Sequence, residues 1–334
     1  MANEKWIFDL HIFDANVQTT LLNNDSTAPY NDLSPTIKTF YKTSLLENAR
    51  SEHYFNQFGM RQPLPKNNGK KVEWRKFDTF AKALTPLTEG VTPDGNKVNM
   101  TKIEKEIAQY GDYTTVSDRL ELEAVDPVIT AITEEHGAQA GDTLDTVTRN
   151  EVVSGTNVIY AGGQASRATV TSSHKLTPAL VNQAFTFLKK MKTPTINGHY
   201  VAIIHPSVAY DLRESSDWLD VHKYAQPNEI YNGEIGMLHN VRFIETPEQK
   251  VWTTTNGAVY ATVFFGKDAW GIIDPSAESL EVIVKQRGSA GTADPLDQRS
   301  TVGWKASHAA KILYQERLVR IESGSFYSST DTAN

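Results

Sequence analysis

The chain has 334 residues, of which 39% are hydrophobic and 22% are charged, and its formal net charge at pH 7 is −7. This composition excludes a wholly disordered chain, and the length predicts about two domains. With no cysteine, disulfides, thiolate nucleophiles and cysteine-bound metal clusters are excluded as well. No apolar run of membrane-spanning length and no signal-peptide pattern is present, so we expect a protein that is made and used inside a cell.

The N-terminal segment predicts an arm followed by a helix. Residues 1–32 are polar and rich in asparagine, with a net charge of −4, and favour an extended conformation. Ser34 is a suitable helix cap and Pro35 suits the first turn. Apolar residues then recur at helical spacing until Gly59, where we expect the helix to end.

Two extended segments, residues 70–80 and 98–115, are predicted to pair as a long hairpin. In the second segment, one set of residues alternates with the charged set Lys102, Glu104 and Glu106, which is typical of a strand with one wet face. The first set is Thr101, Ile103, Lys105 and Ile107. Residues 86–96 between them are rich in proline, glycine, asparagine and aspartate, which favour turns. Because a two-stranded ribbon is marginally stable alone in water, we expect it to pack against another element.

The longest predicted helix spans residues 127–153, with Asp126 as its cap and Pro127 in its first turn. At 1.5 Å per residue it forms a rod of about 39 Å. Its buried stripe comprises Ile129, Ile132, His136, Ala140, Leu144 and Val147. Because His136 lies within this stripe, we interpret it as a structural histidine rather than a metal ligand.

From Lys175 onward the pattern becomes a mixture of helices and strands. We predict a helix over residues 177–191 and a short buried strand over residues 200–204. We interpret the segment from His205 to Ser207 as a strand-to-helix turn capped by the serine, rather than as a catalytic pair. Further strands are predicted at residues 241–244, 259–265, 280–284 and 309–321, with a polar loop at 287–300.

The search for catalytic chemistry finds no recognisable motif. A glycine-rich phosphate loop, a Gly-x-Ser-x-Gly motif and a His-Glu-x-x-His motif are all absent. His199 and His205 bracket one strand at about 20 Å, which is too far to share a metal ion. Asp217 and Asp220 are interpreted as solvated surface residues. We therefore predict no catalytic, cofactor-binding or metal-binding residues.

Charge is segregated along the chain. Residues 61–82 carry seven basic and two acidic side chains, and residues 112–151 carry ten acidic and two basic ones. One interpretation is two solvated faces, and a second is that the basic residues touch DNA. A third is that one segment docks on the other, in the same chain or in a neighbouring chain, and we favour the neighbouring chain. The candidate interface places Arg61, Lys66, Lys70, Lys71, Arg75 and Lys76 against Glu121, Glu123, Glu134, Glu135, Asp142 and Asp145.

Four collinear stretches resemble the major capsid proteins of tailed phages, the family typified by coliphage N-four. The first is Leu-Thr-Glu-Gly-Val-Thr-Pro-Asp-Gly at residues 87–95. The others are residues 116–120 with 126–127 and 145–150, residues 232–236 with 240–243, and residues 294–305 with 319–322. The sequence departs from the family pattern at His239-Asn240, where a glycine is expected.

The resemblance implies the Hong Kong ninety-seven type of capsid fold, an α+β fold with an arm, an E-loop ribbon, a spine helix and two domains. It assigns residues 1–59 to the arm and first helix, 60–116 to the E-loop ribbon, 117–174 to the spine helix and start of the peripheral domain, 175–277 to the axial domain, and 278–334 to the peripheral strands and C-terminal tail.

The implied role is structural and non-enzymatic. Copies of the chain would assemble in the host bacterial cytoplasm, as hexamers and pentamers, into an icosahedral virion shell around double-stranded DNA, with no cofactor and no membrane. Scaffold, portal and cement or decoration proteins are candidate partners. Because only residues 1–32 precede the first helix, we expect no scaffolding segment to be removed. A nanocompartment shell of the same fold and an α+β enzyme with an unrecognised site remain open as alternatives.

Overall fold

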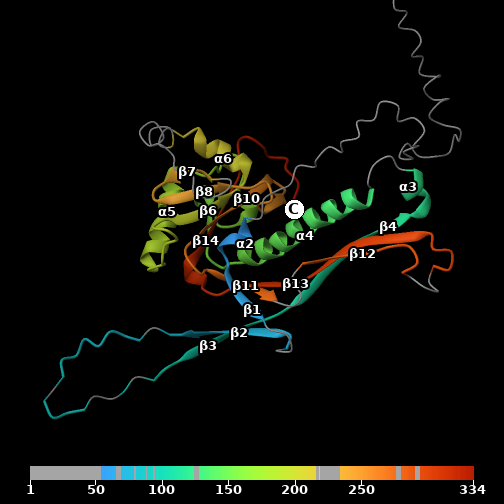
Figure 1. Cartoon of the computed structure of the whole chain (residues 1–334). Helices are drawn as coiled ribbons and strands as arrows, with labels where there is room; N and C mark the ends of the chain where they lie inside the picture. Colours follow the sequence, from blue (N-terminus) through green and yellow to red (C-terminus); the bar gives the residue numbers. More distant parts are fainter. Residues whose placement is uncertain are drawn as a thin grey trace, which may run out of the picture. The chain divides into compact units, whose positions relative to one another are not determined.

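The computed structural model describes residues 54–64, 69–78, 80–87, 89–92, 95, 97–123, 128–215, 218, 234–275, 280–289 and 294–334 (Figure 1). The chain divides into two compact units. The larger comprises Ala49–Asp112, His136–Ile283 and Gly303–Asn334, and the smaller comprises Met1–Asn48, Tyr113–Glu135 and Val284–Val302.

The described residues form a mixture of helices and strands. The α-helices are α2 (Phe55–Phe58), α3 (Asp118–Glu123), α4 (Val128–Val153), α5 (Pro178–Lys190) and α6 (Pro206–Arg213), and the 3₁₀ turns are η3 (Ala161–Gly163), η4 (Arg167–Thr169) and η6 (Gln315–Arg317). The strands are β1 (Met60–Leu64), β2 (Lys71–Phe77), β3 (Met100–Glu106), β4 (Ala108–Ser117), β5 (Val158–Tyr160), β6 (Tyr200–Ile204), β7 (Glu234–Leu238), β8 (Val241–Glu245), β9 (Val251–Thr254), β10 (Gly257–Phe265), β11 (Trp270–Pro275), β12 (Glu281–Lys285), β13 (Arg299–Ile312) and β14 (Leu318–Ser323).

A seven-stranded sheet forms the centre of the larger unit, in the order β5-β14-β10-β6-β8-β7, with β9 also paired to β10. Its strand β6 is buried on both faces. Tyr200, Ala202 and Ile204 contribute to one core, and Val201 and Ile203 contribute to the other. This alternation explains why the predicted strand is apolar along its whole length.

Helices α5 and α6 cover the first of these cores. Val181 and Leu188 of α5 and Leu212 of α6 are fully buried there. Helix α5 begins as predicted, because Thr177 accepts a hydrogen bond from the backbone N–H of Leu180.

The cap of α6 differs from the prediction. Nδ1 of His205 accepts the backbone N–H of Ser207 at 3.2 Å, so the histidine is the cap. Ser207 instead lies inside the first turn, and its hydroxyl donates to Asp331 at 3.0 Å. A histidine at this position supplies a neutral ring nitrogen as the acceptor, which the usual capping preferences do not anticipate.

The second core contains Phe55 of α2, Val152 of α4 and Trp270 of β11. The ring of Trp270 lies edge-on to Phe265 with centroids 4.7 Å apart. Helix α2 ends at Phe58, and Gly59 follows it closely against β11: a Cβ there would lie 2.3 Å from a side-chain atom of Ile272. The helix predicted to start after Ser34 lies outside the described residues except for this last turn.

Helix α4 confirms the predicted long helix. His136 and Ala140 are buried, whereas Ile129 and Leu144 are half-buried. The proposed cap and first-turn proline, residues 126–127, lie outside the described residues. Three polar residues, Asp145, Thr148 and Arg149, are buried on the same helix, and apolar periodicity could not reveal them.

A second sheet has the order β1-β11-β13-β12, with β4 also paired to β13. Strands β2 and β3 form a separate antiparallel ribbon, from Lys71 opposite Glu106 to Phe77 opposite Met100 (Figure 1). The predicted strand over residues 98–115 is therefore divided into β3 and β4, which pair with different partners. The predicted strand over residues 309–321 is likewise divided between β13 and β14, which belong to different sheets.

In the smaller unit, α3 follows directly from β4. The backbone N–H of Asp118 donates to the carbonyl of Gln298 at 2.9 Å. The loop before β13 is held by Asp294, whose carboxylate accepts the backbone N–H of Arg299 at 2.8 Å. The polar loop predicted over residues 287–300 thus ends in a hydrogen-bonded turn at the start of β13.

The C-terminal segment is fastened to the larger unit through Asp331. Its carboxylate accepts hydrogen bonds from Tyr260 at 2.7 Å, from Ser207 at 3.0 Å and from Ser328 at 2.6 Å. Burial opposes the charge of Asp331, but these hydrogen bonds lower its pKa below the ordinary value. Burial, together with the hydrogen bond to Asp331, raises the pKa of Tyr260 to about 12.

Candidate subunit interface

The ribbon β2–β3 is anchored at its base by apolar packing. Val72 and Trp74 are buried in a cluster with Ile273, Ala309 and Leu313. A ribbon of two strands is marginally stable alone, so this apolar cluster supplies the packing against another element that we expected from the sequence.

Two ion-pair groups reinforce this base. Glu151 of α4 accepts Lys105 of β3 at 3.0 Å and Lys311 of β13 at 2.9 Å. Burial raises the pKa of Glu151, but the two lysines outweigh it, and the net effect is a lowered pKa. On β2, Lys76 pairs with Glu316 at 2.7 Å.

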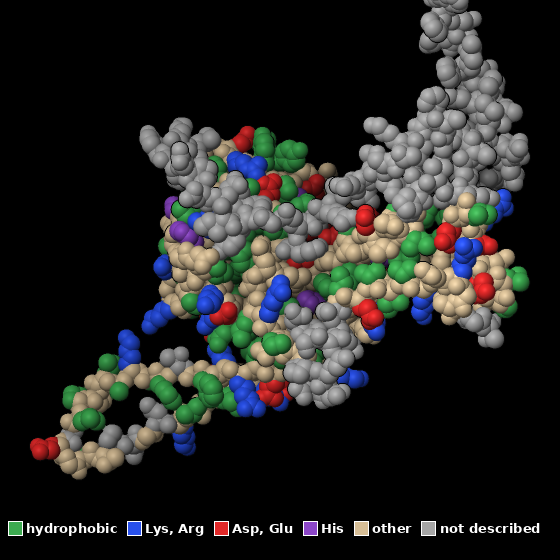
Figure 2. Space-filling view, viewed as in Figure 1, with side chains coloured by type: hydrophobic (Ala, Val, Ile, Leu, Met, Phe, Trp, Pro, Cys, Tyr) green, Lys and Arg blue, Asp and Glu red, His purple; other side chains and the backbone are tan. Residues whose placement is uncertain are grey.

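The last pair of the ribbon and the loop beyond it expose several large apolar side chains. Between 50% and 81% of each is exposed in this chain, and Figure 2 shows such side chains along the loop. They are Phe77, Phe80, Leu84, Leu87, Val91, Val98 and Met100. We call this set the apolar tip. Exposed apolar clusters of this kind mark surfaces that are covered by a partner.

Sequence reasoning missed the apolar tip. The turn-forming residues at 86–96 directed attention to local conformation, and the basic residues directed it to charge. The available signal was the recurrence of Phe80, Leu84, Leu87 and Val91 within a segment that is otherwise rich in turn formers. Loops without a partner seldom carry this many large apolar residues.

The structure separates the predicted basic residues into three groups. Arg61 lies on β1, paired with β11, and Lys66 lies outside the described residues. Lys70 and Lys71 are exposed at the ribbon's base, with no ion pair to any described residue. The remaining two are held within the chain: Arg75 pairs with Glu73 at 2.8 Å, and Lys76 pairs with Glu316.

The exposed face of the ribbon also neutralises much of its own charge. Glu73 and Glu104 lie directly opposite each other, which is unfavourable for like charges. Lys102 pairs with both, at 2.9 Å from Glu73. Hydrogen bonds from Lys102 and Arg75 lower the pKa of Glu73.

The predicted acidic residues have different surroundings as well. Glu134 and Glu135 of α4 are exposed, and Asp142 is half-buried. Asp145 is only 6% exposed, and its carboxylate accepts the backbone N–H of Asn56 at 2.9 Å, which commits it to its own chain.

The other two predicted acids lie on α3. Glu121 has a carboxylate oxygen 3.5 Å from Nε of Arg287. Glu123 ends α3, but its side chain lies outside the described residues.

The histidines singled out by the sequence have structural partners. Nδ1 of His136 and Oε1 of Gln139 lie 3.1 Å apart, and the indole N–H of Trp304 donates to the same oxygen at 3.0 Å. His199 contacts Asn240 at 2.7 Å, and His205 caps α6. The contact between His136 and Gln139 agrees with the structural interpretation of this histidine, which remains a prediction. Asp217 and Asp220 lie outside the described residues.

Among the described residues, no group of three or more histidine, aspartate or glutamate side chains is arranged to hold a metal ion. Among the same residues, no helix combines the length and apolar character that crossing a membrane requires.

The profile of one protein family, described as phage capsid protein, matches residues 101–321, which is more than half of the chain. No curated protein matches the sequence. A nanocompartment shell and an enzyme, the alternatives left open by the sequence, are not favoured by this match.

The fold is that of phage capsid shells. The capsid of the cyanophage P-SCSP1u aligns with a TM-score of 0.65 and 14% identity, over 90% of this chain and 96% of that one. The capsid of Ralstonia phage GP4 aligns with a TM-score of 0.67 and 13% identity, over 90% and 98%. That of cyanophage Pam1 has a TM-score of 0.67 and 14% identity, over 86% and 95%.

These solved structures confirm the expected tailed-phage capsid fold, while the family itself rests on the sequence profile. The profile match shows that this chain belongs to the phage capsid protein family, as a structural major capsid protein of a bacteriophage.

Proposed function

We propose that copies of this chain, as hexamers and pentamers, build the icosahedral head that encloses the double-stranded DNA of a tailed phage. The observation that carries this proposal is the family match over residues 101–321, supported by the apolar tip. Assembly takes place in the host bacterial cytoplasm, and the product is part of the virion. Scaffold, portal and cement or decoration proteins are partners that this role allows.

The proposed contact between copies has two parts. The apolar tip of one copy is covered by its neighbour, which removes large apolar side chains from water and supplies most of the favourable free energy. Lys70 and Lys71 then lie against acidic side chains of that neighbour, with the exposed Glu134 as a candidate. Arg75, Lys76 and Asp145 leave the predicted pairing set, because each is already engaged within its own chain.

The charged part of the contact sets orientation more than affinity. Each exposed pair contributes only about 0.2–1 kcal/mol, so a few pairs form a weak contact. Repeated around a ring of subunits, such pairs still favour one register over others. Weak contacts also allow a misplaced copy to leave during assembly.

We also propose that the role is purely structural. The sequence carries no recognised catalytic motif, and the histidines that might have suggested one have structural partners. A hydrolase or transferase activity that persists through purification, and that one point substitution abolishes, would contradict this part of the proposal.

The test of the contact is a charge reversal at the ribbon's base. Lys70→Glu combined with Lys71→Glu is expected to reduce the yield of capsomers and closed shells in the absence of DNA, as measured by sedimentation and negative-stain electron microscopy. High salt is expected to have the same effect on the wild type, because it screens exposed charges.

The matched control is Lys175→Glu with Lys267→Glu, which reverses two exposed lysines of the larger unit that lie outside the ribbon. This control should assemble like the wild type. If the ribbon variant forms normal empty shells and only DNA packaging suffers, the lysines contact DNA and the proposed subunit contact is wrong.

A further inference from the structure

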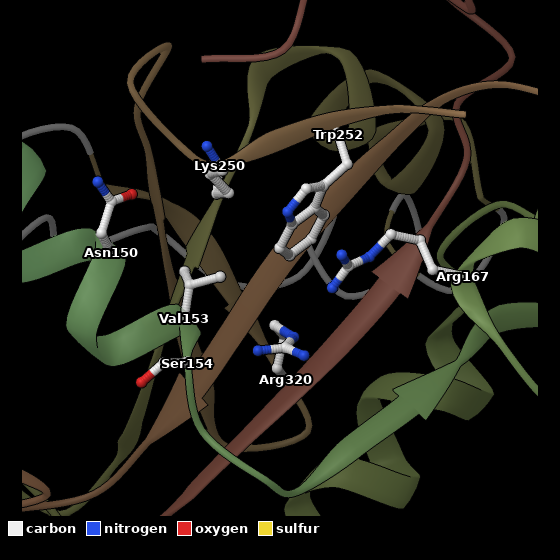
Figure 3. Close-up of a pocket in the computed structure, with 7 residues that line it drawn as sticks. All are labelled: Asn150, Val153, Ser154, Arg167, Lys250, Trp252 and Arg320. Atoms are coloured by element: carbon white, nitrogen blue, oxygen red, sulfur yellow. The ribbon is translucent and has the colours of Figure 1, made fainter.

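A cavity of about 280 Å³ lies in the larger unit between the end of α4, η4, β9 and β14 (Figure 3). Three of its lining side chains are cationic: Arg167, Lys250 and Arg320. The guanidinium of Arg167 lies against the ring of Trp252, 3.5 Å from its centroid. The stacking holds the positive charge of Arg167 in place against the face of the Trp252 ring.

A buried carboxylate, Glu322, pairs with the two arginines. Nε and Nη2 of Arg167 each donate to it at 2.7 Å, and Nε of Arg320 donates at 2.8 Å. Lys250 donates to the main-chain oxygen of Asn334, the last residue of the sequence, and this terminal carboxylate offsets part of its charge. Among the described residues, the three cations still outnumber these two carboxylates, which leaves an excess of positive charge in the wall of the cavity.

This excess of charge is costly where it is partly removed from water. The side chain of Arg320 is only 8% exposed, and burial lowers its pKa. Burial likewise lowers the pKa of Lys250, and the nearby Arg149 and Arg167 lower it further. An anion in the cavity would relieve both the burial cost and the mutual repulsion.

The remaining donors suit an anion with several oxygens better than a planar carboxylate. The paired N–H groups of Arg167 that match a carboxylate are already used by Glu322. What remains is a set of separate donors from different elements: the remaining amino group of each arginine, and the amine of Lys250. Asn150 adds another, because its side-chain oxygen accepts Arg149 and leaves its amide nitrogen to donate.

We propose that this cavity is a binding site for a phosphate group, supplied either as free phosphate or by the backbone of a nucleic acid. A phosphate carries about −1.5 to −2 charges at neutral pH, which would offset the excess of positive charge in the wall. Its oxygens are arranged tetrahedrally, which suits donors that converge from different directions. The proposal is independent of how the copies contact one another.

The test is calorimetric titration of the full-length protein with inorganic phosphate at constant ionic strength, using acetate as the planar control. Lys250→Gln removes one charge-assisted donor and is expected to weaken phosphate binding about tenfold. Asn150→Asp keeps an acceptor for Arg149 but adds a negative charge to the cavity, so it should weaken binding without loosening the fold. Lys267→Gln, an exposed lysine elsewhere in the same unit, should leave binding unchanged.

Competition with a short DNA duplex distinguishes the two sources. Displacement of bound phosphate by the duplex identifies nucleic acid as the source, and the absence of displacement identifies free phosphate. The proposal is overturned if wild type, Lys250→Gln and Asn150→Asp bind phosphate equally well, if none of them binds it, or if acetate binds as tightly as phosphate. Melting curves without phosphate verify that each variant is folded.

Discussion

Replacing Glu151 by glutamine should loosen the base of the ribbon. The carboxylate of Glu151 joins Lys105 of β3 to Lys311 of β13. Glutamine keeps the size of the side chain and one acceptor oxygen, but it removes the negative charge. Both lysines then lose their counter-ion, while the apolar packing of Trp74 is left intact.

The magnitude follows from the exposure of the three side chains. Glu151 is 16% exposed, whereas Lys105 and Lys311 are 36% and 38% exposed. Exposed ion pairs contribute about 0.2–1 kcal/mol and hydrogen bonds to buried charged groups about 1.5–3 kcal/mol. Because the lysines keep part of their hydration, we expect the substitution to cost about 1–2 kcal/mol in total.

The effect should also depend on pH. The pKa of Glu151 is lowered in the folded protein, so its contribution is fully present above the ordinary value of 4.5 and is lost as the pH falls through the lowered value. Thermal melts at pH 7 should therefore show a lower Tm for Glu151→Gln than for the wild type, by about 1–3 °C. The difference should shrink progressively below pH 4.5.

Glu134→Gln is the matched control, because it changes an exposed carboxylate on the same helix. If Glu151→Gln and Glu134→Gln melt alike at pH 7, the two lysine contacts contribute nothing to stability. If the Tm difference for Glu151→Gln stays constant down to pH 3, the lost stability does not come from the charge of Glu151. Either result refutes the reasoning.

Two further predictions concern the ribbon and the C-terminal segment. Trp74→Ala removes the largest side chain from the buried cluster at the ribbon's base, so it should lower the free energy of unfolding by about 3–5 kcal/mol. Residues 78–99 should then be cleaved much faster in limited proteolysis. Unchanged cleavage would contradict the anchoring role. Asp331→Asn replaces the carboxylate that accepts hydrogen bonds from Tyr260, Ser207 and Ser328. Hydrogen exchange in residues 325–334 should therefore accelerate at pH 7. Near pH 2 the wild type should exchange as fast as the variant, because Asp331 is then protonated.

The sequence predicts secondary structure well where a local pattern of residues determines it. The predicted start of helix α4 lies within one residue of the observed start, because its apolar stripe from Ile129 to Val147 repeats over about five turns. The strand β6 was predicted with both of its ends, because turn-forming residues flank an apolar run. Each of these signals lies within a single short window of the chain.

Prediction failed where the answer depends on distant partners. The apolar run over residues 309–321 reads as one strand, but β13 and β14 pair with different sheets, and the polar turn η6 separates them. The predicted pairing set of the candidate subunit interface has the same limit, because partners that are distant along the chain could not be recognised. Lys76 looks free in the sequence, although its partner Glu316 lies 240 residues away along the chain.

The burial of the polar residue Asp145 could not be predicted from the sequence either. Asp145 appears as one of ten acidic residues in a charged segment, yet it is committed to the backbone of Asn56, 89 residues earlier. The domain boundaries inferred from the resemblance, such as an E-loop over residues 60–116, remain predictions. In the structure the paired ribbon itself spans β2 and β3, and β1 and β4 join the second sheet.

A density map of the assembled particle from electron cryo-microscopy tests the central claim most directly. We expect a closed shell in which the side chains from Phe80 to Val98 of each copy are covered by a neighbouring copy, with Lys70 and Lys71 near acidic residues of that neighbour. Closed shells in which the apolar tip remains exposed to solvent, or purified protein that forms no shells at all, would contradict the account.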